Sequence, residues 1–401
     1  MRVLLVGSGG REHALAWAIA RSPLLTELHA APGNPGIAEL ASCHPVRADD
    51  LSSLVPLAQE LRPDLVVVGP EAALVAGLAD ELRHRGIPVF GPSAAAARLE
   101  GSKAFAKDVL AAAGVPQAER LREAQAPCVV KADGLAAGKG VWVCRDDEEV
   151  AAALRSAEAL GQPFHVEELL EGPEASLFAL CDGTGVLPLP AAQDYKRVGD
   201  GDLGPNTGGM GSCSPSSALA ESEVDGLVAD VVVPVLAELD RRGTPFTGCL
   251  FAGLMLTERG PRVLEFNCRF GDPETQSLLP RLDGDLLEAL AACAAGDVGG
   301  VQLAARAEAA VTIVLAGRDY PESGDVGTPI RGVDEAQATG ALVFHAGTAL
   351  HGGSLVTNGG RILCVTALGA TVDLARTAAY DAAARIDFGG VKYRHDIAAH
   401  V

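Results

Sequence analysis

The sequence predicts a multidomain protein of mixed α/β and α+β architecture that begins with a doubly wound parallel sheet. Three observations indicate this fold class: the length of 401 residues, alternating strand and helix patterns in the first hundred residues, and mixed patterns beyond them. At roughly 150 residues per domain, the chain is long enough for two or three cores. Hydrophobic residues make up 48% of the sequence, which suits well-buried domains.

The first hundred residues alternate between buried-type strands and amphipathic helices. Strands are predicted at residues 2–6, 27–31, 65–68 and 88–90, with helices at 11–21, 51–61 and 74–85. Such alternation is typical of a parallel sheet covered by helices on both faces. The alanine-rich segment 92–101 is interpreted as a connector, so a first domain is predicted at residues 1–101.

Two further domains are expected, at residues 102–293 and 294–401. Ser102 suits the N-cap of a helix that ends at Gly114, and strands and helices follow it. The third domain is predicted to be mixed α+β. Its expected strands are 309–316, 341–345 and a pair around Asn358-Gly359-Gly360, followed by a helix at 372–386.

Composition limits the classes of partner. The formal net charge of −20 argues against sequence-independent binding to nucleic acid or anionic lipid. Nine cysteines without any C-x-x-C pair indicate reduced thiols rather than zinc sites or a disulfide framework. The N-terminal apolar run is too short for a signal sequence, and no run approaches the length of a membrane span. We therefore expect a soluble cytoplasmic protein.

The stretch VVKADGLAAGKGVWV, residues 129–143, reads as strand, glycine-rich loop and strand. It is not a Walker phosphate loop, because Gly138 comes one residue too early and Gly140 stands where a hydroxyl should follow Lys139. A loose surface hairpin is one interpretation. However, Lys131 lies in an apolar strand, where a lysine is costly unless it meets a negative partner. The alternative is that Lys131 and Lys139 hold the phosphates of a nucleotide.

The turn GSGGREHA after the first strand matches the dinucleotide fingerprint only in part. Gly7 and Gly9 fit, but Glu12 occupies the third glycine position, and the second strand ends without an acid for a ribose. A phosphate at this helix N-terminus and a tight turn without a ligand both remain open.

The stretch RVLEFNCRFGDPETQ, residues 262–276, places polar residues on one strand face. Glu265, Asn267 and Arg269 point together, while Leu264, Phe266 and Cys268 are expected in a core. A carboxylate and an amide oxygen suit Mg²⁺, with Arg269 facing a transferring phosphoryl group. The alternative is a solvated edge strand. Asp272-Pro273-Glu274 follows as a helix start, with Asp272 as cap.

Two further segments carry candidate ligand contacts. Residues 193–212 are predicted to form a long glycine-rich loop with Asp194, Lys196 and Arg197, which favours a substrate-binding role over disorder. Residues 165–176 alternate like a strand that ends in a turn. Backbone groups at Glu168 to Leu170 could pair with a purine and Glu174 with a ribose, although these acids alone also suit a solvated face.

Several motifs together resemble one family. KADGLAAGKG, DYKRVGDGDLGPNTGGMG, EFNCRFGDPETQ, FHAGT and TNGGRILCVTALG follow GSGGREHA and PGNPG in this order. This set closely resembles the glycinamide ribonucleotide synthetase family of the ATP-grasp superfamily, over essentially the whole chain. The resemblance implies a central ATP-grasp domain and the ligation of glycine to 5-phosphoribosylamine in purine synthesis, with ATP consumed through a glycyl phosphate. It also implies a divalent cation, Mg²⁺ or Mn²⁺, and we expect a monomer.

The resemblance also implies residue roles. Metal ligands would be Glu265 and Asn267, and catalytic residues would be Lys131, Asn267 and Arg269. ATP-binding residues would be Lys103, Lys131, Gly134, Gly138, Lys139, Gly140, Glu167, Glu168, Leu170 and Glu174, with residues 134–140 as a mobile flap. Substrate-binding residues would be Gly9, Gly10, Asn34, Asp194, Lys196, Arg197, Gly209, Arg269, Lys392 and Arg394. The chain departs from the family pattern at Tyr195 (usually His), Pro173 (usually an acid) and His395 (usually Lys).

Two other functions remain as alternatives. A nicotinamide-dependent dehydrogenase would use the N-terminal sheet, but the third glycine and the ribose acid are missing. A nucleotide sensor without turnover would keep the fold, and the presence of Glu265, Asn267 and Lys131 argues against it.

Overall fold

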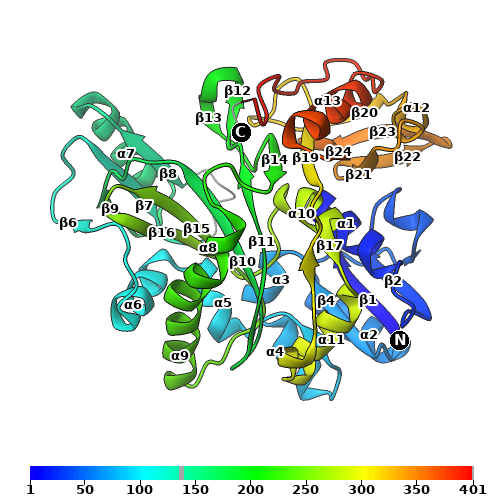
Figure 1. The fold of residues 1–401 in the computed structure, drawn as a ribbon, viewed down its shortest axis with the longest axis horizontal. Helices are drawn as coiled ribbons and strands as arrows, with labels where there is room; N and C mark the ends of the chain where they lie inside the picture. Colours follow the sequence, from blue (N-terminus) through cyan, green and yellow to red (C-terminus); the bar gives the residue numbers. More distant parts are fainter. Residues whose placement is uncertain (135–139, 400–401) are drawn as a thin grey trace.

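The computed structural model describes residues 1–134 and 140–399. An N-terminal region, a small projecting lobe and a C-terminal region surround a large central sheet (Figure 1). The lobe carries the small sheet and α7, and it lies on the opposite side of the central sheet from the N-terminal region. The predicted multidomain α/β and α+β class is confirmed.

The N-terminal region is a five-stranded parallel sheet in the order β3-β2-β1-β4-β5. Val3 and Leu5 of β1 share a buried cluster with α1, whereas Leu4 and Val6 share one with α2 and α4. Successive strand side chains point to opposite faces, so helices cover both. The bounds are β1 Arg2–Gly7, α1 Gly10–Ile19, β2 Glu27–Pro32, β3 Ser42–Cys43, α2 Leu51–Leu61, β4 Leu65–Val68, α3 Glu71–Val75, α4 Leu78–His84 and β5 Val89–Phe90.

Two local expectations in this region are wrong. The helix expected at 74–85 is two helices, α3 and α4, because Gly77 between them adopts a left-handed conformation with φ of 89°. The supposed connector 92–101 contains a helix, α5 (Ala94–Gly101), whose cap is Ser93. The Ser93 hydroxyl accepts the Ala96 N–H, and the run of alanines favours a helix.

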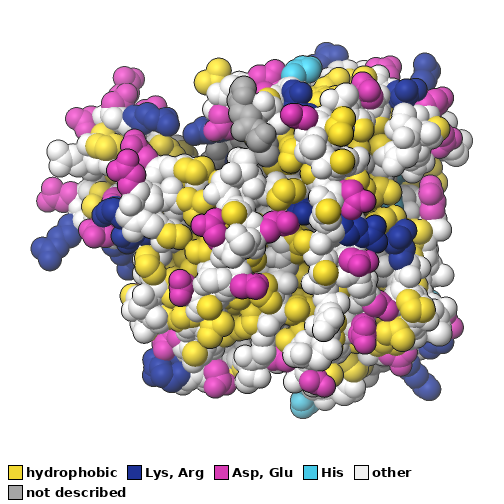
Figure 2. Space-filling view, viewed as in Figure 1, with side chains coloured by type: hydrophobic (Ala, Val, Ile, Leu, Met, Phe, Trp, Pro, Cys, Tyr) yellow, Lys and Arg dark blue, Asp and Glu magenta, His cyan; other side chains and the backbone are white. Residues whose placement is uncertain are grey.

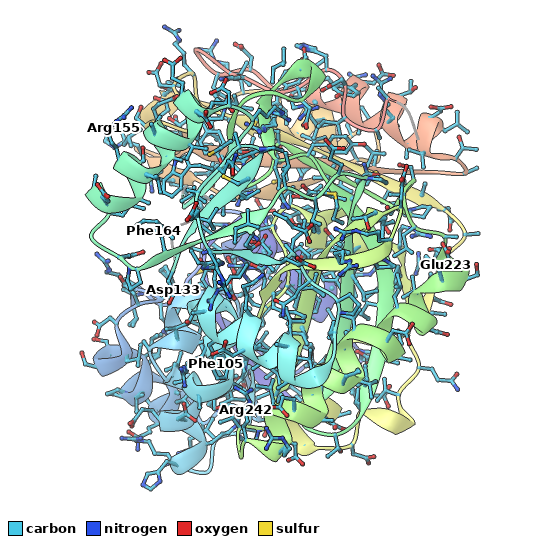
Figure 3. All side chains as sticks on the ribbon, turned by 90° about the vertical axis from the view of Figure 1, so that its left-hand side faces the viewer. Phe105, Asp133, Arg155, Phe164, Glu223 and Arg242 are labelled. Carbon is cyan, nitrogen blue, oxygen red and sulfur yellow. The ribbon has the colours of Figure 1, made fainter. Side chains whose placement is uncertain are left out.

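The small lobe contains a four-stranded sheet in the order β6-β9-β7-β8. Strands β7 and β8 pair as predicted, with Lys131 opposite Val141. Asp133, labelled in Figure 3, directly follows β7. It ties the lobe to the start of α6, because its carboxylate accepts the Ser102 hydroxyl and the Ala104 N–H. Ser102 caps α6, as expected. The bounds are α6 Lys103–Ala113, β6 Arg120–Leu121, β7 Cys128–Ala132, β8 Val141–Cys144, α7 Asp147–Ala159 and β9 Phe164–Glu168.

The large sheet has eight strands in the order β16-β15-β10-β11-β14-β19-β24-β21. Its last three strands, β19, β24 and β21, belong to the C-terminal region. Strand β19 pairs with β14, so the C-terminal region extends the central sheet. Helices α8 to α11 belong to the same part of the chain. The bounds are β10 Glu174–Asp182, β11 Val186–Asp194, β14 Gly211–Ser214, α8 Glu221–Leu227, a π-helix Val228–Val232, α9 Val233–Arg241, β15 Thr247–Thr257, β16 Gly260–Asn267, α10 Glu274–Leu278, β17 Leu282–Asp283, α11 Leu286–Ala295 and β18 Ala304–Ala305.

The C-terminal region also contains a separate three-stranded sheet, β20-β23-β22. The two strands predicted around Asn358-Gly359-Gly360 are present as β23 and β24, and they lie in different sheets. The bounds are β19 Ala309–Ala316, β20 Asp325–Pro329, α12 Val333–Gln337, β21 Leu342–His345, β22 Thr348–His351, β23 Ser354–Gly359, β24 Arg361–Gly369 and α13 Val372–Ala383.

The segment predicted as one long loop, 193–212, is partly ordered into strands. After β11 it forms a small hairpin of β12 (Arg197–Gly199) and β13 (Leu203–Asn206), and it then enters β14. Acidic side chains are scattered over the face seen in Figure 2, with Lys and Arg among them. Within the described residues, no helix has both the length and the apolar character that crossing a membrane requires.

Candidate active site

A cleft of two connected compartments lies among the small lobe, the large sheet and the N-terminal region. The first compartment, of about 480 Å³, reaches Arg11, Arg269 and Arg361; the second, of about 780 Å³, reaches Glu168 and Leu170. They are continuous, because both are lined by one set of residues: Lys131, Glu167, Asp194, Lys196, Asn206, Thr207, Leu264 and Glu265. Most of the predicted site residues therefore line one cleft.

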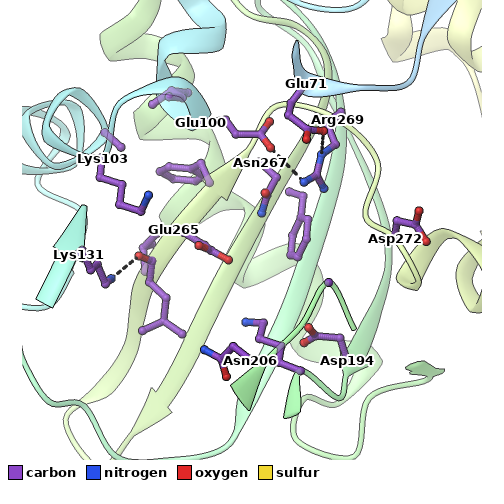
Figure 4. Close-up of a pocket in the computed structure, with 18 of the residues that line it drawn as sticks. Glu71, Glu100, Lys103, Lys131, Asp194, Asn206, Glu265, Asn267, Arg269 and Asp272 are labelled. Atoms are coloured by element: carbon purple, nitrogen blue, oxygen red, sulfur yellow. Dashed lines mark hydrogen bonds and ion pairs between the residues drawn. The ribbon is translucent and has the colours of Figure 1, made fainter. Parts of the chain in front are cut away.

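The predicted polar face of β16 lines the first compartment. Glu265, Asn267 and Arg269 point into it together (Figure 4). Leu264 was expected in the core, but this prediction is wrong. Gly253 is opposite Glu265 and Leu254 is opposite Val263, so Leu264 is the extra residue of a bulge and faces the cleft. The strand lies at an edge of the sheet, but its polar face borders a cavity rather than open solvent.

Arg269 is held by acids from two other elements. Its guanidinium lies 3.0 Å from Glu100 Oε1 and 3.3 Å from Glu71 Oε2. Burial opposes the charge of Glu71, yet Arg269 and Arg11 lower its pKa to about 2. Burial raises the pKa of Glu100, and Arg269 counteracts that rise. No sequence pattern singled out Glu71 or Glu100, because they lie far along the chain from Arg269.

Lys131 meets the negative partner that its burial requires, and this partner is a protein carboxylate. Its Nζ lies 2.8 Å from Glu167 and donates to the Leu264 carbonyl at 3.1 Å. Glu167 also pairs with Lys107 at 2.9 Å and with His165 at 2.8 Å. Burial opposes the Glu167 charge, but His165 and the two lysines lower its pKa. Lys107 was missed by sequence reasoning.

The second lysine assigned to ATP, Lys103, also faces the cleft. Its Nζ donates to the Gly134 carbonyl at 3.2 Å, and burial lowers its pKa while Glu265 opposes that effect. Gly138 and Lys139 lie outside the described residues, so the flap interpretation stays a prediction. At the far side of the cleft, Glu168 accepts the Glu119 N–H at 3.1 Å, and Leu170 is buried.

A cluster of acids surrounds Lys196 where the compartments meet. Lys196 donates to Glu174 at 2.6 Å. Burial opposes its charge, yet Asp194 and Glu174 raise the pKa of Lys196. Burial raises the pKa of Asp194 to about 6 and, with the help of Asp194, that of Glu274 to about 8. Glu274 was expected only as a first-turn acid, but it is buried and lines the first compartment.

The expected role of Asp272 as a helix cap is wrong. Helix α10 begins after Pro273, which is its N-cap, and no side chain bonds there. Asp272 instead pairs with Arg361 at 3.2 Å and accepts from Gln276 at 2.7 Å. Its side chain is therefore used in the wall of the first compartment.

Four predicted substrate residues contact other parts of the protein. The Gly9 N–H donates to Glu12 Oε2 at 2.6 Å, and a side chain on Gly10 would collide with Gln276. Asn34 bonds the Ser8 and His345 carbonyls, and Lys392 donates to the Tyr320 carbonyl at 3.3 Å. Among the described residues that line the two compartments, these four are not included. Gly209, with φ of 106°, lies against Pro273 and is also not among the described residues that line the two compartments.

The donor set fits a small divalent cation. One carboxylate, Glu265, and one amide, Asn267, stand two residues apart in a cavity that also contains lysines and arginines. Within the described parts of the chain, no group of three or more His, Cys, Asp or Glu residues could hold a metal by itself. A site with only two protein oxygens suits Mg²⁺ or Mn²⁺ that takes its remaining ligands from phosphate and water.

Fold and site together define the class. A cleft between a small antiparallel lobe and a larger sheet, with the buried Lys131 on the lobe and an acid-amide pair on the sheet, is that of an ATP-grasp protein. Family models match the chain as the phosphoribosylglycinamide synthetase N domain at residues 1–100, the ATP-grasp (A) domain at 101–275 and the C domain at 310–400. The chain belongs to the phosphoribosylglycinamide synthetase family.

Individual relatives agree over the full length. Phosphoribosylamine-glycine ligases of Streptomyces coelicolor and Mesorhizobium japonicum are 53% and 51% identical, covering 100% and 99% of this chain and 99% and 97% of theirs. The crystal structure of the Thermotoga maritima phosphoribosylamine-glycine ligase has a TM-score of 0.85 at 34% identity, covering 99% of this chain and 100% of that one. A Campylobacter jejuni biotin carboxylase, at 14% identity and a TM-score of 0.71, covering 98% of this chain and 92% of that one, shares the fold.

Proposed function

We propose that this protein ligates glycine to 5-phosphoribosylamine with ATP, which yields glycinamide ribonucleotide, ADP and phosphate in purine biosynthesis. The full-length similarity to phosphoribosylamine-glycine ligases carries this proposal. Its chemical support is that Lys131, Glu265, Asn267 and Arg269 line one cleft.

The chemistry requires activation of a carboxylate. A carboxylate anion has no good leaving group, so a glycine carboxylate oxygen first attacks the γ-phosphorus of ATP. This step forms glycyl phosphate and breaks the bond from the γ-phosphorus to the bridging oxygen of ADP, which is released. The phosphoribosylamine nitrogen then attacks the glycyl carbon and expels phosphate. Lys131 and Arg269 offset negative charge on the transferring group. When bound, the cation held by Glu265 and Asn267 supplies further charge neutralisation.

Each compartment has a distinct role in this proposal. The purine lies in the second compartment against the backbone of Glu168 to Leu170, and the triphosphate extends past Lys103 and Lys131. Glycine lies in the first compartment, where Asp194 and Glu274 offer acceptors to its amino group. The walls of the cleft keep water away from the glycyl phosphate, which would otherwise be hydrolysed.

The proposal also covers the setting of the reaction. The cation is Mg²⁺ or Mn²⁺, the partners are ATP, glycine and 5-phosphoribosylamine, and the protein acts as a cytoplasmic monomer. The net charge of −20 and the nine cysteines, none of them in a C-x-x-C pair, support this location and this monomeric state. Light scattering of the purified protein would contradict the monomer if it gave twice the chain mass of 41.0 kDa.

One assay tests the proposed function. ADP release is measured with ATP and Mg²⁺ in the presence of glycine, of 5-phosphoribosylamine, or of both. The ligase requires both for sustained release. Release that needs neither substrate, or ATP binding without turnover, would favour the sensor instead, and oxidation of an alcohol with NAD would favour the dehydrogenase.

A further inference from the structure

The C-terminal segment lies against the small hairpin at the second compartment. We call residues 392–399 the strap and residues 197–206 the hairpin. The hairpin supplies Arg197, Gly201, Asp202 and Asn206 to the wall of the compartment, and the strap supplies Arg394, Asp396 and Ala399. Part of this wall therefore depends on how two segments almost 200 residues apart are held together.

Arg394 of the strap makes the central contacts. Its Nε and Nη2 donate to both oxygens of Asp396, at 2.7 and 2.8 Å. Its Nη1 donates to the Arg197 carbonyl and to Asp202 Oδ1, each at 3.1 Å. Arg394 is only 3% exposed, so the guanidinium is buried, whereas the Asp202 end of its contact faces solvent. With three of its nitrogens used in this way, Arg394 has little capacity left for a substrate.

The tip of the hairpin has a conformation that needs external support. Asp202 has φ of 59°, a left-handed conformation that costs a non-glycine residue free energy. Its partner in the structure is Arg394. The neighbouring Gly201 N–H donates to Asp396 at 2.8 Å, and Asp200 accepts the His395 N–H at 2.7 Å. The strap thus contacts three consecutive residues of the tip.

Arg394 supplies the positive charge that neutralises the carboxylates at this junction. Asp200, Asp202 and Asp396 bring three carboxylates to the junction, and Arg394 is the buried cation among them. Without it, Asp202 and Asp396 would face each other with no compensating charge, and they would repel. The Arg394 guanidinium also lies over the Tyr195 ring, 5.3 Å from its centre, which adds a cation–π contact.

We propose that Arg394 is a positioning residue that fastens the hairpin to the strap and thereby completes the wall of the second compartment. It does so without contacting substrate, in contrast to the substrate-binding role that the sequence predicted for it. The consequence for catalysis rests on the proposed function, because only then does ATP occupy this compartment. The effect of Arg394 on the hairpin does not depend on the proposed function.

The first experiment measures hydrogen exchange in the full-length, nucleotide-free protein. Arg394→Gln should speed exchange of residues 197–206 by about tenfold or more, because the tip loses its buried cation. Exchange of β19, in the same region, should stay unchanged. Asp202→Asn removes the charge at the exposed end of this contact but keeps an Oδ1 acceptor and a residue that tolerates a left-handed conformation. It should therefore speed exchange of the hairpin in the same direction but by less, with less risk to folding. Arg385→Gln, an exposed arginine just after α13, is the matched control.

The second experiment separates binding from chemistry. In Arg394→Gln the KM for ATP should rise about threefold or more while kcat at saturating ATP stays within about twofold. Arg394→Lys keeps the positive charge but loses the bidentate pairing with Asp396. The KM for ATP of this variant should therefore lie between those of the wild type and Arg394→Gln.

Unchanged exchange of the hairpin in both Arg394→Gln and Asp202→Asn, in folded protein, would overturn the proposal whatever the activity. Loss of kcat with an unchanged KM for ATP would also overturn it, because that result belongs to a residue that acts in the chemical step. Faster exchange in the variants, together with no ligation by the wild type, would support the fastening role and count against the proposed function alone.

Discussion

Glu265 carries the only carboxylate of the proposed acid-amide metal pair, so its charge should matter for turnover more than for folding. We predict that Glu265→Gln lowers kcat about a hundredfold, because one metal-bound charge next to the transferring phosphate is lost. The melting temperature should change by less than about 2 °C, since the side chain is only partly buried and lines a cavity. Both quantities are measured at saturating Mg²⁺.

The matched control for this prediction is Glu258→Gln. Glu258 is an exposed acid in the turn between the strands β15 and β16, and it lines neither compartment of the cleft. Its substitution should leave both turnover and melting temperature unchanged. Near-normal kcat in Glu265→Gln would remove Glu265 from the metal site.

Glu274 should make the stability of the empty protein depend on pH. Burial raises its pKa to about 8 from an ordinary value of 4.5. An acid with a raised folded-state pKa binds its proton more tightly in the folded state, so its stabilising contribution is present at low pH and is lost as pH rises through about 8. We predict that Glu274→Gln unfolds like the wild type near pH 5 but is more stable than the wild type near pH 8, by about 1 kcal/mol or more.

Denaturant unfolding of nucleotide-free protein across this range checks the prediction. Glutamine resembles the protonated acid in shape, which is why the two proteins should agree at the acidic end. A stability difference that stays constant with pH would show that Glu274 is not the titrating group.

Among the elements, α5 connects parts of the site that the chain separates. Glu100 at its end accepts the Cys268 N–H at 2.8 Å and pairs with the Arg269 guanidinium at 3.0 Å. One carboxylate therefore holds both the backbone after β16 and the side chain that faces the cleft. Lys103 begins the next helix only three residues later. The contacts of Glu100 therefore also help to position Lys103 relative to the polar face of β16.

We predict that Glu100→Gln lowers both stability and turnover. The variant keeps an acceptor for Cys268 but loses the charge that holds Arg269, which should cost about 1–3 kcal/mol of unfolding free energy. Turnover should fall because Arg269 is less well oriented. Calorimetry and steady-state kinetics measure these effects, with the exposed Glu60 on α2 changed to Gln as control. An unaltered melting temperature with unaltered kcat would mean that Glu71 alone suffices to hold Arg269.

At the scale of the whole molecule, the cleft is built from every region. The N-terminal region supplies Arg11 and Glu71, the lobe supplies Lys131, and the C-terminal region supplies Tyr320 and Arg361. The eight-stranded sheet makes the central and C-terminal regions one continuous structure. A ligand in the cleft should therefore stabilise the folded molecule as a unit.

We predict that ATP with Mg²⁺, at about a hundredfold above its Kd, stabilises the protein by about 2.7 kcal/mol, because it binds the folded state and not the unfolded chain. Removing the metal with a chelator should reduce this gain, since the acid-amide pair then faces phosphate without a cation. Thermal unfolding with each addition measures both effects. A larger stabilisation by NAD than by ATP would contradict the assignment of the cleft.

Local pattern was enough to predict much of the fold. Strands β4 and β19 and helix α2 have the predicted bounds, because a run of β-branched residues or a helical apolar spacing is complete within one segment. The shared face of Glu265, Asn267 and Arg269 was predictable for the same reason: alternation along a strand is a property of neighbouring residues. The motifs quoted for the family resemblance likewise lie within short stretches.

Only the tertiary structure decided what those faces meet. The bulge at Leu264 depends on the register with β15, and the continuity of the large sheet depends on the pairing of β14 with β19. Glu71, Glu100, Glu274 and Lys107 enter the cleft because distant elements pack beside β16 and β7. The positioning role that we propose for Arg394 likewise rests on contacts that the tertiary structure creates. Its partners Arg197 and Asp202 are almost 200 residues away in the chain. A buried charge needs partners that are close in space, and the spacing of residues within one segment does not identify such partners.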